Sequence, residues 1–304
     1  PSFALHVKPS TPSLAQELQA HVGNQHVTTV MQELYNALFF AGSIGKELRD
    51  AIQLWGISHL VAISGFHLGV IYGVGYFLLM PLYRFFHDRY FPYRNRGIDI
   101  SVMLFAFLLG YLWLIGFVPS FLRAFVMSLL GFVLISRHIK ILSFMTLSLT
   151  VLLILAFFPA LLFNIGFWFS VMGVFYIFLY LHHFKENFTS WQHMILINFW
   201  VFSAMNIPVH YWFPFTAWQQ WGAIPLSILF SLFYPVSAFL HLIGEGQWLD
   251  QWVEWLLHLK TNSAMVETPL WALVGYLGLS LVSIFQRHLA VFIVTLGIVP
   301  FFFI

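Results

Sequence analysis

The sequence predicts an all-α fold, a polytopic integral membrane helical bundle. Of its 304 residues, 60% are hydrophobic and only 8% are charged, whereas soluble domains carry about 25% charged residues. The mean hydropathy is +0.85. The apolar residues form long continuous blocks without the period-2 alternation of a membrane β-barrel, and about 20 such residues cross the hydrocarbon as a helix.

Residues 1–56 predict amphipathic helices at or outside the membrane surface. In the third of these helices Leu48, Ile52 and Trp55 recur at i, i+4 and i+7, and charged residues fill most of the other positions. We therefore divide the chain into an extramembrane or interfacial segment, residues 1–56, and a transmembrane channel domain, residues 57–304.

About eight spans are expected, together with amphipathic or re-entrant helices. The predicted spans lie at 57–83, 98–117, 120–136, 140–158, 161–181, 222–243, 269–285 and 289–303. The apolar block at 191–213 is interrupted by Asn206 and Pro208, and we expect that it does not cross, because Arg287 then lies inside. A stripe of tryptophans within 244–260 predicts an interfacial helix.

Basic residues after the first span set the expected orientation. The loop contains Arg84, Arg89, Arg94 and Arg96, which outnumber its acidic residues. The positive-inside rule places this loop in the cytoplasm and the N-terminal segment outside.

Composition also excludes several kinds of chemistry. The chain has no cysteine, which excludes disulfides, zinc–thiolate sites and iron–sulfur clusters. No ligand spacing such as H-E-x-x-H occurs, so we expect no metal site and no cofactor. The net charge of +2 does not by itself demand a nucleic-acid partner.

The stretch "HLVAISGFHLG", residues 59–69, places polar and helix-weakening residues at the head of an apolar run. In a regular helix Ser64 and His67 lie nearly opposite a face made of Gly65, Gly69 and Gly73. Such glycines are typical of close helix packing. An ionisable group inside a span usually faces a cavity or a partner, although a neutral histidine bonded to a backbone carbonyl is the structural alternative.

Two later spans also carry polar residues near their predicted outer ends. Arg123 fits a fixed positive charge at the mouth of a path for anions, or an arginine that snorkels to the headgroups. In the fifth span Asn164 points away from a face of small residues. The predicted channel-lining or motif residues are His59, Ser64, Gly65, His67, Arg123, Asn164 and Ser170, and the predicted helix-packing glycines are Gly69, Gly73, Gly166 and Gly173.

Three stretches resemble the ComEC/Rec2 competence family. "LRDAIQLWGISHLVAISGFHLGVI" is similar to the family's signature, with matches at Gly56, His59, Leu60, Ala62, Ile63, Ser64, Gly65 and His67. "PSFLRAFVM" matches a second segment at Arg123, Ala124 and Met127. "FPALLFNIGFWFSVMGV" matches a third at Pro159, Gly166, Phe167 and Ser170, but departs from it at Phe158 and Trp168. The resemblance covers about residues 40–235.

This resemblance implies a protein of the bacterial inner membrane that passes single-stranded DNA into the cytoplasm during natural transformation. The implied partners are the lipid bilayer, single-stranded DNA, a separate nuclease, a DNA-receptor protein and a cytoplasmic helicase-type motor, and a homodimer is open. Family members often add an oligonucleotide-binding-fold domain and a metallo-β-lactamase-like domain. Neither is recognisable here, so we expect this chain not to be an enzyme.

Two other functions are weighed against the channel. A small-solute transporter would show inverted repeats and broken helices at the bilayer midplane, and no repeat is visible. A rhomboid-like intramembrane serine protease would use Ser64 as its nucleophile. Its G-x-S-G motif is not met, and a histidine three residues away on one helix is poorly placed to take the serine proton.

Overall fold

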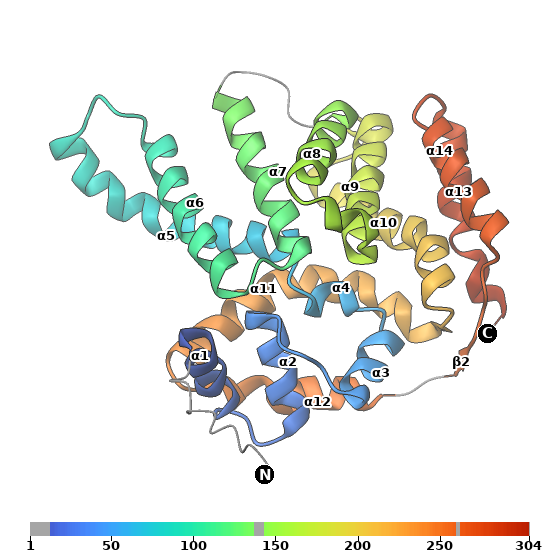
Figure 1. Cartoon of the computed structure of the whole chain (residues 1–304), viewed down its shortest axis with the longest axis horizontal. Helices are drawn as coiled ribbons and strands as arrows, with labels where there is room; N and C mark the ends of the chain where they lie inside the picture. The colour runs from blue at the N-terminus through green and yellow to red at the C-terminus, as the bar shows by residue number, and fades with distance from the viewer. Residues whose placement is uncertain (1–12, 137–142, 260–261, 304) are drawn as a thin grey trace, which may run out of the picture.

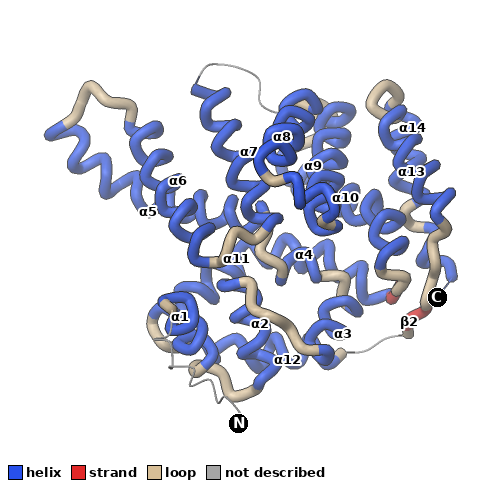
Figure 2. The backbone as a smooth tube through the Cα atoms, in the orientation of Figure 1, coloured by secondary structure: helices blue, strands red, loops and turns tan. Residues whose placement is uncertain are grey.

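The computed structural model describes residues 13–136, 143–259 and 262–303, and within these ranges the protein is almost entirely helical (Figures 1 and 2). The strand pairing found there joins β1 (Thr216–Ala217) to β2 (Ser263–Ala264) in antiparallel register. The prediction of an all-α helical fold is confirmed.

Four helical hairpins form the upper layer in Figure 1. They are α5 (Gly65–Tyr90) with α6 (Arg96–Leu114), α7 (Pro119–Ser136) with α8 (Phe144–Phe157), α9 (Ile165–Phe184) with α10 (Ser190–Trp212), and α13 (Leu270–Val282) with α14 (Arg287–Leu296). The short helices η1 (Pro159–Phe163) and η4 (Val299–Phe303) follow α8 and α14. The turns of the first, third and fourth hairpins lie at one end, which we call the turn end. There, the Arg287 guanidinium lies 4.5 Å from the Phe184 ring.

The helix α10 shows that residues 191–213 are not interrupted, contrary to the sequence interpretation, and it is long and apolar enough to cross a membrane. It is one continuous helix of 23 residues with Pro208 inside it. Ring contacts join it to α9 near both ends: Tyr180 meets His193 at 5.6 Å, and Phe169 meets Trp212 at 5.4 Å. Because α10 runs antiparallel to α9 along most of its length, the two helices cross together or not at all.

The predicted span 222–243 corresponds to the helix α11 (Ala223–Leu242), and its crossing stays a prediction. With η2 (Trp218–Gly222) before it, α11 is one of five helical segments long and apolar enough to cross a membrane, beside α5, α6, α9 and α10. Both of its ends nevertheless contact the N-terminal segment. Gly222 lies against the Trp55 ring, and the His241 carbonyl accepts a hydrogen bond from Gln25. In Figure 1, α11 runs across the view beneath the hairpins.

The remaining helices pack with α11 into a second layer, which we call the lower layer. They are α1 (Leu14–Gly23), α2 (Thr29–Phe40), α3 (Lys46–Leu54), α4 (Ser58–Val61), η3 (Gly246–Leu249) and α12 (Asp250–His258). One hydrophobic core joins α1, α2, α3, α4, α11 and α12, and it includes Tyr35, Ile52 and Leu257. The N-terminal helices are amphipathic because one face of each enters this core. The predicted division at residue 56 stays a prediction, and the core it concerns extends beyond that point.

Candidate functional site at the start of α5

The sequence predicted that the stretch 59–69 is the start of one regular span, and the structure shows that it is not. It contains the last turn of α4, a break, and the first turn of α5. Ala62 and Ser64 both have extended backbones, with ψ of 126° and −178° respectively. The predicted span 57–83 therefore begins at Gly65, and the helix continues to Tyr90.

Ser64 and His67 form a capping box at this break. The Ser64 Oγ accepts the Phe66 N–H at 3.3 Å, and the His67 Nδ1 accepts the Ser64 N–H at 3.2 Å. Residue N3 of a capping box is usually Glu or Gln, and histidine fills that place here. The sequence predicted that Ser64 lies on the helix, opposite the glycine face. This prediction is wrong, because Ser64 is the N-cap and lies outside the helix.

The other side of the His67 ring faces α11. Its centroid lies 5.3 Å from that of Phe230 and 4.7 Å from that of Tyr234, both in edge-on geometry. Since Nδ1 is an acceptor, the hydrogen of the neutral ring resides on Nε2. His67 is 0% exposed, and its Nε2 has no hydrogen-bond partner among the described residues. A buried polar hydrogen is thus left unused beside the helix break.

Arg123, on α7, is the second polar residue at this break. It is only 5% exposed, and its Nη2 would lie 3.6 Å from a Cβ built on Gly65. Its Nε is buried without a partner in the described ranges, and Nη1 lies 3.9 Å from the Met127 sulfur. No ion pair with an acidic side chain is found for it within those ranges. The expectation of a snorkelling arginine is wrong, because the side chain is buried in protein.

The helix α7 is held against the break by a contact that the sequence did not suggest. The Ser120 hydroxyl donates to the carbonyl of Ile63, and Gly65 lies close to Ala124. A Cβ at residue 65 would lie 3.1 Å from the Ala124 Cβ, so glycine permits this close approach.

His59 lies on the lower side of the break. Its Nδ1 contacts the Gly56 carbonyl at 3.1 Å, and its Nε2 contacts the Ser227 Oγ of α11 at 3.2 Å. Together with the His67 contacts, this places α11 directly against both histidines of the motif.

The polar residues of the fifth predicted span lie at the same end of the bundle but are not brought into contact with Ser64 by any described hydrogen bond. Asn164 is the N-cap of α9, and its Oδ1 accepts the Phe167 N–H at 2.9 Å. Ser170 is half-buried, nearly two turns further along. Because α5, α7 and α9 each begin opposite the turn end, their first turns all face the lower layer.

The predicted packing glycines require correction. Among the described residues, no neighbouring helix comes within 4 Å of a Cβ built at Gly69, Gly73 or Gly173, and at Gly166 the near atom is the Oδ1 of Asn164. The close approach of α5 to α6 occurs instead at Gly75, where a Cβ would lie 2.6 Å from Leu104. The 100° spacing shows which residues share a face, but it cannot show which face a neighbour meets.

The four arginines predicted on the cytoplasmic side lie at the turn end of α5 and α6. Three of them are paired: Arg84 and Arg96 lie 3.7 and 3.6 Å from Asp88, and Arg94 lies 2.6 Å from Asp99. Arg89 lies 6.0 Å from the ring of Tyr90. Much of the positive charge of this loop is therefore balanced locally.

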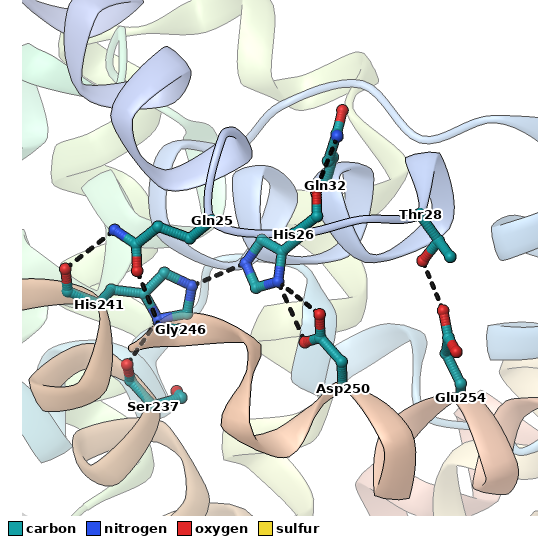
Figure 3. Close-up of polar contacts among 9 residues, drawn as sticks. All are labelled: Gln25, His26, Thr28, Gln32, Ser237, His241, Gly246, Asp250 and Glu254. Carbon is teal, nitrogen blue, oxygen red and sulfur yellow. Dashed lines mark hydrogen bonds and ion pairs between the residues drawn. The ribbon is translucent and has the colours of Figure 1, made fainter. Parts of the chain in front are cut away.

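Sequence reasoning missed a polar cluster in the lower layer, made of His26, His241 and Asp250 (Figure 3). The His26 Nδ1 lies 2.8 Å from the Asp250 carboxylate, and its Nε2 lies 2.9 Å from the His241 Nε2. More than 200 residues separate His26 from the other two, so no local spacing could have indicated the cluster.

Comparison with known proteins shows which family this sequence resembles. The sequence profile of the family described as competence protein matches residues 40–290. The chain is 29% identical over 240 residues to ComE operon protein 3 of Bacillus subtilis, covering 74% of this chain and 29% of that protein. It is 29% identical over 246 residues to Recombination protein 2 of Haemophilus influenzae, covering 76% of this chain and 30% of that protein.

A shorter similarity links the chain to a Mycoplasma pneumoniae protein named MG316 homolog, at 36% identity over 157 residues, covering 51% of this chain and 37% of that one. The chain thus spans about a third of the length of the curated relatives it matches. No solved structure matches it significantly. The family profile, which includes the helix break and extends over most of the chain, shows that this protein belongs to the competence protein family.

Proposed function

We propose that this protein passes single-stranded DNA across the bacterial inner membrane during DNA uptake. The proposal rests on family membership and on one structural observation, the buried Arg123 of α7, which lies beside the start of α5. The strand would enter from the side of the lower layer and leave at the turn end of the hairpins.

The charge distribution supports this orientation. The turn end carries Arg84, Arg89, Arg94 and Arg96 beside the α5–α6 loop, Lys185 after α9, and Arg287 at the start of α14. By the positive-inside rule this end is cytoplasmic, and the lower layer with the N-terminal segment is outside. If α10 crosses in place of α11, Arg287 stays on the cytoplasmic side, as the sequence predicted.

Arg123 is the observation that carries the proposal. Burying an unpaired charge costs several kcal/mol, and fixed positive potential is already present where helix N-termini gather. A polyanion offsets both costs, because each of its phosphates brings a negative charge and hydrogen-bond acceptors. The first turns of α5, α7 and α9 would add their partial positive charges to the same end of the bundle.

The chain is proposed to translocate the strand without cutting it. A separate nuclease, a DNA-receptor protein and a helicase-type motor in the cytoplasm would act before and after it. A second copy of the chain is a further candidate partner. The activities of the longer relatives are carried over only as part of this proposal.

Arg123→Met tests the proposal, because methionine keeps much of the side-chain volume and removes the charge. In liposomes that hold the purified protein, the variant should admit single-stranded DNA at least tenfold more slowly. Its binding should lose about 0.7 from the slope of log affinity against log salt, the amount expected for one phosphate contact on a single strand. Its thermal stability should not fall, since an unpaired buried charge is replaced by an apolar group.

Arg49→Met is the matched control, because Arg49 is exposed on α3 in the lower layer. Normal DNA entry and an unchanged salt slope in Arg123→Met would overturn the site assignment. Loss of entry accompanied by unfolding would identify Arg123 as a structural residue instead.

A further inference from the structure

The cluster of His26, His241 and Asp250 joins three distant parts of the lower layer through three consecutive short contacts (Figure 3). The Ser237 carbonyl faces the His241 Nδ1 at 2.6 Å, the two histidine Nε2 atoms lie 2.9 Å apart, and the His26 Nδ1 faces the Asp250 carboxylate at 2.8 Å. The cluster thereby links the loop after α1 to the end of α11 and the start of α12.

Protein surrounds both rings. His26 and His241 are each 4% exposed, and Tyr35 stacks on His26 with the ring centroids 4.4 Å apart and the planes 4° from parallel. Nitrogen and oxygen atoms at these distances repel each other unless a hydrogen lies between them. Each of the three contacts must therefore contain one hydrogen.

Counting these hydrogens fixes the protonation of the cluster. Two neutral histidines and an ionised aspartate supply two hydrogens, which is one too few for three contacts. If both histidines hold their hydrogen on Nδ1, two bare Nε2 atoms face each other at 2.9 Å. If His241 holds its hydrogen on Nε2, its bare Nδ1 faces the Ser237 carbonyl. The closed cluster thus contains one additional proton, shared among Asp250, His26 and His241.

The surrounding groups are compatible with this count. The cluster faces Tyr35 from α2, and burial raises the pKa of that phenol, which keeps it neutral. Burial raises the pKa of Asp250 and lowers the pKa of His241, so the additional proton is retained on the Asp250–His26 side of the cluster. Glu254 is engaged by the Thr28 hydroxyl at 2.5 Å. His21 lies further out, with its ring 3.4 Å from the Gln25 amide, which donates to the His241 carbonyl.

We propose that this cluster is a proton-operated latch, which holds the N-terminal helices more firmly on α11 and α12 while it contains its additional proton. Because α11 also packs against His59 and His67 of the motif, the latch controls how firmly the lower layer covers the start of α5. This inference does not depend on what the protein transports.

The proton count predicts a bell-shaped dependence on pH. An open cluster exposes two histidines of ordinary pKa, about 6.5. Above that pH the open form binds two protons and the closed form three, so closing weakens as the pH rises. Below it the open form binds four, so closing weakens as the pH falls. The ratio of closed to open molecules should be greatest near pH 6.5 and fall about 25-fold by pH 8.5, if the closed cluster retains its proton.

Asp250→Asn separates this latch from an ordinary structural contact. An asparagine amide supplies its own hydrogen to the His26 Nδ1, so two neutral histidines complete the other two contacts. The closed variant then needs no additional proton. Its closed-to-open ratio should rise about fourfold from pH 6.5 to 8.5, where the wild-type ratio falls, and only the acidic limb should remain.

Hydrogen–deuterium exchange of the 304-residue protein in lipid nanodiscs, between pH 5 and 9, measures this ratio as the protection of α1 and α2. Glu254→Gln is the matched carboxylate-to-amide control, and His258→Gln is the matched histidine control on the same helix; both should keep the two limbs. A flat wild-type profile after correction for intrinsic exchange, or an Asp250→Asn variant that loses protection over the whole pH range, would overturn the proposal.

Discussion

Replacing Ser64 tests whether the motif is a helix cap or a catalytic group. Ser64→Ala removes the Oγ that accepts the Phe66 N–H and lies 3.3 Å from the His67 Nδ1. Loss of an N-cap side chain costs about 1 kcal/mol, within a range of about 0.5–2 kcal/mol. We therefore expect the free energy of unfolding to fall by about that amount and the first turn of α5 to exchange its amide hydrogens about fivefold faster.

Ser64→Asn is the informative partner of this variant. Asparagine is as good an N-cap as serine but has no hydroxyl to act as a nucleophile. Asparagine is preferable to aspartate, because a carboxylate beside Arg123 would neutralise that charge. Ser64→Asn should keep both the protection of α5 and DNA entry into liposomes.

The assay pairs hydrogen–deuterium exchange of residues 62–70 with DNA entry, each measured for wild type, Ser64→Ala and Ser64→Asn. A Ser64→Asn variant that is fully protected yet transports no DNA would refute the capping argument and show that the hydroxyl has a chemical role. Equal protection in Ser64→Ala and wild type would also refute it.

Two further predictions concern the packing of the helices. A Cβ at Gly297 would lie 1.7 Å from the Ser203 carbonyl oxygen of α10. Gly297→Ala should therefore lower the free energy of unfolding by about 1–3 kcal/mol. Gly275→Ala should leave the free energy of unfolding unchanged, because a Cβ there meets no described atom within 4 Å. Equal melting temperatures of the Gly297→Ala and Gly275→Ala variants would contradict the close approach at Gly297. If α11 does not cross, single cysteines at exposed Trp218 and Leu242 should react with an impermeant maleimide from the same side of a vesicle; labelling from opposite sides would show a span.

The fold class followed from the sequence because the length and hydropathy of helical segments are local properties. Among the described residues, five helical segments are long and apolar enough to span a membrane, and both α10 and α11 are among them. Polar Asn206 suggested a broken segment, whereas in the structure its amide donates to the Gly297 carbonyl of α14. α11 contacts the lower-layer core and α5, and it also exposes large apolar side chains such as Leu232, Phe239 and Leu242. Hydropathy measures the demand for apolar surroundings and not whether lipid or protein provides them.

The candidate site was only partly predictable for the same reason. The pattern of Ser64 and His67 was visible, and its meaning as a capping box depended on a helix boundary that an apolar run conceals. Burial of Arg123 depended on how α7 meets the break, through Ser120 and Ala124. The histidine cluster depended on a contact between residues 26 and 241, which only the three-dimensional arrangement of α1 and α11 creates.

The most direct measurement is the entry of a fluorescent single-stranded oligonucleotide into liposomes that contain the purified protein and a complementary quencher strand in the lumen. Quenching that requires the protein, falls at least tenfold with Arg123→Met and does not occur when the same oligonucleotide is supplied as a duplex is the predicted result. Leakage of a small lumenal dye without oligonucleotide entry would support a small-solute pathway, and entry of duplex at the same rate as the single strand would contradict the strand-passing role.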